Sequence, residues 1–466
     1  MDRWEPIRAF FKGNHLERLV EHQLGSYNHF IHSQLPQTIE QFNPVIIHSD
    51  QYYNKELKKY SLEIHLRFQN FQLNRPQIFE NNGSTKVMFP NEARLRNFTY
   101  SSTTTIDIHI QYIVRSGPEL EEVQYFNNII PQVHIGKIPI MLKSSVCVLT
   151  QNAHLSHEIT GECKADPGGY FIINGSEKTV IGQEHTANNR IYCFPANNSQ
   201  KYILQAEMKC SIDSKRVSPK QVNMFITRNP TGEHMIHINI SRIKKNIPIV
   251  IMFRALGILS DLAIYKMVTL EEDTEIATLF RGSIMEGSSC LTQEDALAYL
   301  SANLMYLPYD KYGRKHVYTL DMLFADLFSH CKSLEQRVYL LGYMTNKLIL
   351  CTLKRIPCDD RDSYLNKRVH LTGDLLNDLY RNYFNKLVRD MQKHFARETN
   401  FGSWKSSGDY LRIITPTNIY KGLKPTTIDN GIKRALPGFR QYTKIPKYYW
   451  LIFGDLPVYN FYQWVY

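Results

Sequence analysis

The chain has 466 residues, of which 43% are hydrophobic and 21% charged, so it can build more than one sizeable hydrophobic core. Its formal net charge of +11 favours a polyanionic partner without identifying one. No uncharged apolar run approaches the ~20 residues of a membrane helix, and the cysteines show no zinc-ligand spacing, so the sequence excludes a membrane-spanning helix and a zinc knuckle. Because the charged N-terminal residues lack the apolar core of a signal peptide, we expect reduced, mostly buried cysteines.

The first part of the chain alternates between helix and strand patterns. An apolar set at helical spacing from Leu16 to Leu35 predicts an amphipathic helix that packs on a core. Apolar and polar residues alternate at 62–68 and again at 106–112, which predicts two half-buried strands. A third strand is expected at 133–142. Together these elements predict an α+β region.

Residues 168–184 read GGYFIINGSEKTVIGQE and predict a tight hairpin. Residues 170–173 form a short apolar run suited to a buried strand. Asn174-Gly175 follows, and this pair favours a two-residue turn because both residues tolerate positive φ. Thr179, Val180 and Ile181 then resume the strand. On shape alone, this is one hairpin in a mixed sheet.

A second region starts with two further alternating segments, at 204–212 and 236–240, which predict strands. Mostly helical sequence follows to about residue 350. Within it, one apolar stripe has helical spacing and is interpreted as core rather than as a cofactor site: Leu334, Val338, Leu341, Met344 and Leu348.

Three carboxylates at Asp359, Asp360 and Asp362 raise the hypothesis of a metal site, because clustered carboxylates suit Mg²⁺ in phosphoryl chemistry. Arg361 lies among them and further basic residues follow. The simpler interpretation is therefore a solvated, self-neutralising acidic turn, which we favour over a catalytic site.

The last third of the chain predicts two helices and an unusual tail. Helical spacing from Leu376 to Phe395 predicts a long helix, and residues 426–436 predict a shorter one. Residues 437–466 are rich in aromatic residues but sustain neither a helical nor an alternating pattern. We expect this tail to be poorly packed, as the product of a broken or frame-shifted coding end, because a large exposed aromatic surface is rare in folded proteins.

Several of these segments resemble, in the same order, the N-terminal part of the second-largest subunit of multisubunit RNA polymerases of the eukaryotic, archaeal and large-DNA-virus type. The hairpin at 168–184 resembles the signature hairpin of that family. The other similar blocks are MFPNEARLRNFTYS at 88–101, KIPIMLKS at 137–144, NIPIVIMFRALGILSD at 246–261, DDRDSYLNKRVHLTG at 359–373 and TTIDNGIKRAL at 426–436. Shorter similarities occur at 312–323 and 341–348. After residue 436 the resemblance ends.

The resemblance implies an α+β fold in which a mixed-sheet protrusion domain carries an inserted, mostly helical α+β lobe domain. The implied boundaries are 1–200 for the first part of the protrusion, 201–365 for the lobe and 366–436 for the second part of the protrusion. Residues 437–466 form the aromatic tail outside the family pattern.

The resemblance also implies that the chain is part of a DNA-directed RNA polymerase, a nucleotidyltransferase, and forms part of the wall of its DNA cleft. Implied partners are the largest and the assembly subunits, the DNA template and the RNA–DNA hybrid, with no membrane. No catalytic residue, metal ligand or cofactor is expected on this chain, since the Mg²⁺ and Zn²⁺ sites of the family lie elsewhere. The alternative is a free-standing, truncated polymerase-like module that binds partners or DNA. The nucleus, or for a viral protein the virion or host cytoplasm, stays open as the compartment.

Three basic residues are the candidates for nucleic-acid contact. Lys178, just after the signature turn, is the first choice, and Lys433 with Arg434 is the second. Cationic side chains near turns can reach phosphates without specifying bases. The alternative for each is an ordinary solvated surface residue.

Overall fold

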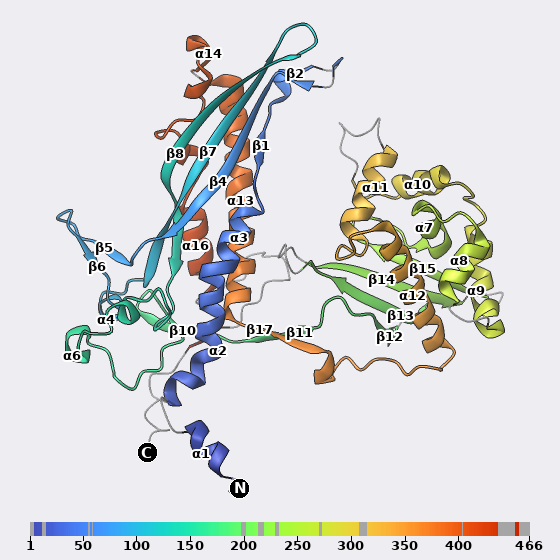
Figure 1. Cartoon of the computed structure of the whole chain (residues 1–466), viewed down its shortest axis with the longest axis horizontal. Coiled ribbons are helices and arrows are strands. Elements are labelled where there is room, and N and C mark those ends of the chain that lie inside the picture. The colour runs from blue at the N-terminus through green and yellow to red at the C-terminus, as the bar shows by residue number, and fades with distance from the viewer. Residues whose placement is uncertain are drawn as a thin grey trace. The chain divides into compact units, whose positions relative to one another are not determined.

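The computed structural model describes residues 4–11, 15–54, 56–57, 59–196, 202–212, 219–228, 233–269, 273–306, 315–402, 404–436 and 453–455. The chain divides into two compact units (Figure 1). Unit 1 comprises residues 1–183 and 369–466, and unit 2 comprises residues 184–368. Both contain helices and open antiparallel sheets, which confirms the predicted α+β class. The naming of these units as protrusion and lobe, with the boundaries given above, stays a prediction.

The main sheet of unit 1 has the strand order β1-β4-β7-β8, and every neighbouring pair is antiparallel. Its strands are β1 (Val45–Ile47), β4 (Leu62–Leu73), β7 (Ser101–Ser116) and β8 (Glu122–Pro139). The three predicted strands are confirmed, but β7 and β8 extend well beyond the alternating segments, into one long hairpin (Figure 1). Along β4, buried and partly exposed residues alternate from Leu62 to Phe68, as the sequence pattern predicted.

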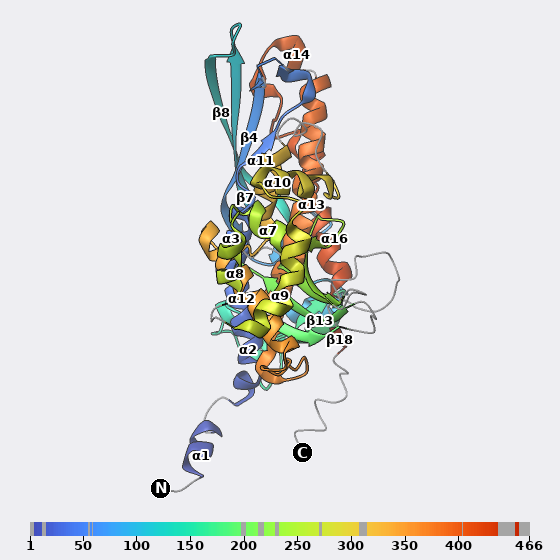
Figure 2. The same cartoon turned by 90° about the vertical axis from the view of Figure 1, so that its right-hand side faces the viewer.

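Helices from both ends of the chain pack on this sheet (Figures 1 and 2). The predicted N-terminal helix is present as α2 (His15–His29), a π-helical turn (Phe30–Gln34) and α3 (Leu35–Glu40), preceded by α1 (Glu5–Phe11). The predicted long helix is α13 (Thr372–Phe401), and the shorter one is α16 (Thr426–Ala435). Short helices α14 (Trp404–Ser407) and α15 (Ile419–Gly422) join them. Thus the core of unit 1 needs both segments of the chain.

Smaller elements lie at both ends of this sheet (Figure 1). They are β2 (Tyr53–Asn54) with β3 (Lys59–Tyr60), β5 (Gln77–Phe79) with β6 (Thr85–Val87), the helices α4 (Pro90–Leu95), α5 (Val148–Gln151) and α6 (His157–Thr160), and β9 (Phe171–Ile173) with β10 (Ser176–Val180). A third strand, β18 (Phe453–Asp455), pairs antiparallel with β10. The expectation that the aromatic tail forms no regular element is therefore wrong for these three residues, because the open edge of β10 offers main-chain partners. The rest of the tail, 437–452 and 456–466, lies outside the described residues.

Unit 2 contains a five-stranded antiparallel sheet in chain order, followed by helices. The strands are β12 (Tyr192–Pro195), β13 (Tyr202–Cys210), β14 (Lys220–Arg228), β15 (His234–Ile240) and β16 (Ile247–Pro248). The predicted strands at 204–212 and 236–240 correspond to β13 and β15. Strands β11 (Gln183–Thr186) and β17 (Lys367–His370), at the two ends of this stretch, pair with each other.

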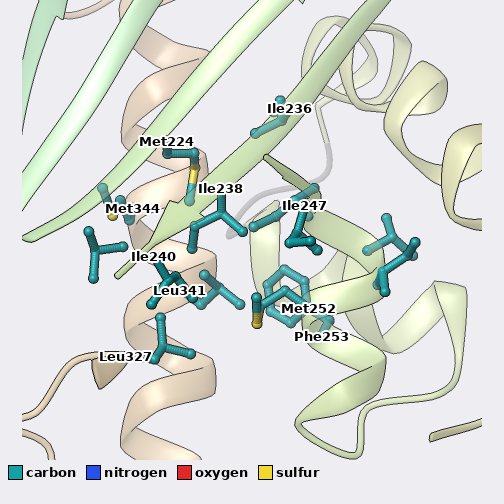
Figure 3. Close-up of a cluster of buried hydrophobic side chains, with 14 of the residues drawn as sticks. Met224, Ile236, Ile238, Ile240, Ile247, Met252, Phe253, Leu327, Leu341 and Met344 are labelled. Atoms are coloured by element: carbon teal, nitrogen blue, oxygen red, sulfur yellow. The ribbon is translucent and has the colours of Figure 1, made fainter. Parts of the chain in front are cut away.

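The helices of unit 2 are α7 (Ile249–Ala255), α8 (Asp261–Val268), α9 (Thr274–Gly287), α10 (Gln293–Ala302), α11 (Lys315–Asp326) and α12 (Leu334–Thr352). Side chains from β14, β15, α7 and α12 meet in the core shown in Figure 3, among them Met224, Ile238, Phe253 and Leu341. The predicted apolar stripe of α12 is buried except at Leu334, which is 38% exposed. Leu334 starts the helix directly after the Ser333 capping box, at its solvent end.

The sequence led to expectations for membrane-spanning helices and for the burial of the cysteines. No helix in the described part of the chain is long and apolar enough to cross a membrane. All eight cysteines are free, and Cys147, Cys193, Cys210, Cys290 and Cys351 are buried, which confirms the prediction of mostly buried thiols.

Candidate nucleic-acid interface

The predicted hairpin has the expected geometry. Asn174 and Gly175 both have positive φ, 49° and 80°, as a primed two-residue turn requires. Ser176 pairs with Ile173, and Lys178 pairs with Phe171. The side chains of β9 are buried, so β9 anchors this hairpin in the core. The side chains of β10 are exposed or half-buried except at Val180.

Main-chain hydrogen bonds join the hairpin to residues 97–100. The N–H of Gly175 donates to the Phe98 carbonyl at 3.0 Å, and the N–H of Tyr100 donates to the Ile172 carbonyl at 2.9 Å. A Cβ at Gly175 would lie 2.9 Å from the Asn97 Cα, so glycine is required here for close approach as well as for its positive φ.

Arg94, in α4, connects three parts of unit 1. Its Nε donates to Glu177 Oε1 at 2.7 Å and its Nη1 donates to Glu162 Oε1 at 2.7 Å. Its Nη2 donates to the Tyr170 hydroxyl at 2.8 Å, and that hydroxyl donates to Asp166 at 2.5 Å. One guanidinium therefore holds both ends of the hairpin against α4.

Burial of Glu162 affects the protonation of its carboxyl in the Arg94 network. The Glu162 side chain is 7% exposed, and its burial raises the pKa of its carboxyl above the usual value although Arg94 acts against this shift. At the surface nearby, hydrogen bonds from Arg96 and Lys86 lower the pKa of Glu80 to about 2. The ion pair between Arg94 and Glu162 is therefore largely buried, whereas Glu80 pairs with Arg96 and Lys86 at the surface.

Lys178 lies in the middle of β10 and is half-buried. The outer edge of β10 pairs with β18, in which Asp455 is the register partner of Lys178. On the inner side, the Gln23 side chain donates to the Val180 carbonyl at 3.0 Å. The structure thus places Lys178 on a strand held from both sides, one residue after Glu177.

Lys433 and Arg434 lie in the last turn of α16, with Lys433 half-buried and Arg434 exposed. This helix packs closely on β8, because a Cβ at Gly136 would lie 3.0 Å from the Ile428 Cβ. The N–H of Lys137 donates to the Asp429 carboxylate. Burial raises the pKa of that carboxyl, although Lys137 and Lys433 act in the opposite direction.

The structure brings Lys433 beside Lys137, and both line one cavity. Lys178 belongs to a different sheet from β8 and does not line this cavity. Sequence reasoning did not select Lys137. It lies inside the KIPIMLKS block, but no local pattern shows that α16 packs beside it.

The acidic loop has a structural role that differs from the expected self-neutralising turn. Asp359 Oδ2 accepts hydrogen bonds from Lys347 Nζ at 2.8 Å and from the Cys193 N–H at 2.9 Å. Arg361 pairs with Glu207 instead of with its acidic neighbours, and stacks over the Phe194 ring at 3.7 Å. The turn is solvated as expected at Asp360, Arg361 and Asp362, which are exposed, but it does not neutralise itself, because partners of Asp359 and Arg361 come from β12, β13 and α12. In the described residues no group of three or more His, Cys, Asp or Glu side chains could hold a metal ion.

Comparisons with known proteins agree on one family. The family model described as RNA polymerase beta subunit matches residues 18–410. The chain is 32% identical over 453 residues to DNA-directed RNA polymerase II subunit 2 of Arabidopsis thaliana, covering 93% of this chain and 36% of that protein. It is 31% identical to subunit RPB2 of Encephalitozoon cuniculi, with the same coverage. Subunit Rpo2N of Methanococcus vannielii is 29% identical and is covered over 74% of its length, against 84% of this chain. The chain thus spans about a third of the first two relatives.

Proposed function

From its membership of the RNA polymerase beta subunit family, we propose that this chain acts as the N-terminal part of the second-largest subunit of a DNA-directed RNA polymerase. The observation that supports this most is the family match through 18–410, because it runs through unit 2 and through both segments of unit 1. In this role unit 1 corresponds to the protrusion and unit 2 to the lobe.

The proposed activity of the complex is nucleotidyl transfer, to which this chain contributes position rather than chemistry. The carboxylates of the acidic loop support this division. Asp359 is committed to Lys347 and a main-chain N–H, and Asp360 accepts from the Asp362 N–H at 2.9 Å. Mg²⁺ and Zn²⁺ are proposed to be held by other parts of the enzyme, and this chain is proposed to hold no cofactor.

The proposed partners in the cleft are the DNA template and the RNA–DNA hybrid. Lys178, Lys433 and Arg434 would contact phosphates, which fixes the position of a nucleic acid without reading its bases. Support comes from the net charge of +11 and from the anchoring of β10 through Arg94. A cation on a held strand loses less side-chain and main-chain freedom on binding than one on a loose loop.

The proposed protein partners are the largest and the assembly subunits, and co-purification tests this. An affinity-tagged copy expressed in its source should carry the largest subunit with it, identified by mass spectrometry. Arg94→Met, which leaves Glu162 buried without its cation, should reduce recovery of the partner by disturbing unit 1. An intact polymerase that forms without this chain, while the chain runs alone, would instead favour a free-standing module.

Nucleic-acid contact is tested by salt dependence. Each phosphate contact that is lost should lower the slope of log K against log salt by about 0.9 for duplex DNA. Lys178→Gln and Arg434→Gln should therefore each lower the slope by about this amount, equally for all sequences. Lys393→Gln, at an exposed position of α13, is the matched control and should leave the slope unchanged. Salt-insensitive or strongly sequence-selective binding would contradict the proposal.

A further inference from the structure

A cavity of about 310 Å³ opens in unit 1 between β5, the start of β7, the end of β8 and α16. This volume is at the small end of the range of about 300–1,000 Å³ for ligand sites. Apolar side chains such as Phe79 and Phe98 form part of its wall, and Lys137 and Lys433 supply two cations. The cavity therefore combines apolar surface with positive charge.

The two lysines form no ion pair with any described residue, although both act electrostatically on Asp429. Both are half-buried, and neither ammonium has an ion pair or a side-chain hydrogen bond with a residue that the structure describes. The carboxylate on which both lysines act is that of Asp429, and it already accepts the main-chain N–H of Lys137. Two like charges facing one partly desolvated space favour an anion between them.

The edge of β5 that faces away from β6 is also open. The N–H of Met88 donates to the Pro76 carbonyl and the N–H of Glu80 donates to the Ser84 carbonyl, so the even-numbered residues of this strand bond to β6. In an antiparallel pair the groups of the intervening residues point to the opposite edge. Those of Gln77 and Phe79 have no main-chain partner there within the described part of the chain. The Phe79 side chain is 63% exposed.

We propose that this cavity and the open edge of β5 bind an extended acidic segment of a partner protein. The segment adds a short strand to β5 and places one Asp or Glu carboxylate between Lys137 and Lys433. Strand addition draws affinity from main-chain hydrogen bonds and specificity from pockets for alternate side chains. Apolar residues of the segment cover Phe79 and Phe98.

An acidic peptide fits this cavity better than a nucleic-acid phosphate, so Lys433 serves the peptide and the phosphate contacts proposed above remain with Lys178 and Arg434. A phosphate would balance the two ammonium groups but would leave the main-chain groups of Gln77 and Phe79 unpaired. It would also leave the exposed Phe79 ring uncovered. A peptide with alternating apolar and acidic residues satisfies all three features at once.

The test measures binding of the full chain to a short fluorescent peptide that alternates valine and glutamate. Fluorescence anisotropy should show saturable binding. Replacing both lysines, in Lys137→Gln with Lys433→Gln, should weaken it about tenfold or more. Phe79→Asp should also weaken it through repulsion, and this exposed position tolerates a polar side chain. Lys393→Gln should change nothing. Hydrogen exchange should slow at the Gln77 and Phe79 amides when the peptide is bound.

Three outcomes would overturn this inference. The first is equal binding of a peptide with glutamine in place of glutamate. The second is peptide binding without protection of the Gln77 and Phe79 amides. The third is a single-stranded oligonucleotide that displaces the peptide and depends on both lysines, which would assign the cavity to nucleic acid. None of these results affects co-purification with the largest subunit, so failure here is distinct from failure of the proposed function.

Discussion

The hydrophobic cores of the two units are built from the chain in different ways. Unit 2 is one continuous stretch, and the residues of its main hydrophobic cluster all lie between Ile191 and Cys351. The cluster of unit 1 extends from Tyr27 to Leu436 and therefore joins segments separated by the whole of unit 2. Unit 2 therefore forms its core from one continuous segment, whereas unit 1 needs two segments to form its core.

Buried polar contacts at the seam of unit 1 show how closely its two segments depend on each other. The Thr38 hydroxyl donates to Asn377 Oδ1 at 2.8 Å, and both side chains are buried. The Gln34 amide donates to Asp374 at 2.9 Å. Because such long-range contacts form only after the loop between them closes, unit 1 should fold more slowly and less independently than unit 2.

Ending the chain after residue 368 should give the largest effect. The truncation removes α13 and α16, and the buried faces of β4 and β7 lose their cover. This loss exceeds a typical domain stability of about 5–15 kcal/mol. Hydrogen exchange should show unit 1 unprotected and β13–β15 of unit 2 still protected. Retained protection in β7 would show that unit 1 does not need its second segment.

A matched pair of core substitutions should separate the two units. Phe384 packs its ring 5.1 Å from Phe42 and 5.5 Å from Phe68 in unit 1, and Phe253 is fully buried in unit 2. Phe384→Ala and Phe253→Ala should each cost about 3–5 kcal/mol. Each substitution should lower the melting temperature of its own unit only, and calorimetry measures both transitions. Equal shifts of both transitions would mean that the units unfold as one.

Removing the arginine of a buried ion pair in unit 1 should cost more stability than removing that of an exposed pair in unit 2. Arg94→Met leaves the buried Glu162 without its cation and should destabilise unit 1 by about 2–3 kcal/mol, below the full cost of breaking a buried pair because Arg94 is partly exposed. In unit 2, Arg355 pairs with Asp273 and Glu275 at 41% exposure, so Arg355→Gln should cost much less stability than Arg94→Met. Urea titration of both variants checks this order, and a costlier Arg355→Gln would reverse it.

The smallest effect is expected for Asp429→Asn, and it depends on pH. Burial raises the pKa of Asp429 above its unfolded value, so the ionised carboxylate destabilises unit 1 at neutral pH. This cost disappears as the pH falls through the raised pKa toward the unfolded value. The variant should therefore be slightly more stable than the native chain at pH 7, with the gap closing toward pH 4. Unit 2 is the internal control, and a gap that widens in acid would contradict this sign.

Much of the fold was predictable because its signals are local. Alternation marked β4, β7, β13 and β15, and helical spacing marked α12 and α13. The turn at Asn174-Gly175 was predictable from the φ preferences of two residues. The lengths of β7 and β8 were not, because the far part of this hairpin pairs strand with strand and shows no continuous alternation of burial.

The candidate site was less predictable than the fold. Lys178, Lys433 and Arg434 could be selected as cations near turns, but the cavity that Lys433 shares with Lys137 could not be predicted. The partners of Asp359 were also unexpected, since Lys347 and Cys193 come from different elements. Contacts of this kind join residues far apart in sequence, and one sequence contains no signal for such pairs.

The sequence by itself determined the family, the α+β class and most helices and strands of this protein, because block similarity, periodicity and turn chemistry act over short stretches. Only the tertiary structure decided that Arg94 holds the hairpin, that Lys137 and Lys433 share a cavity, and that unit 1 closes around residues from both segments of the chain. The physical reason is packing. Which side chains meet depends on how strands and helices stack in three dimensions, and burial then decides which charges need a partner.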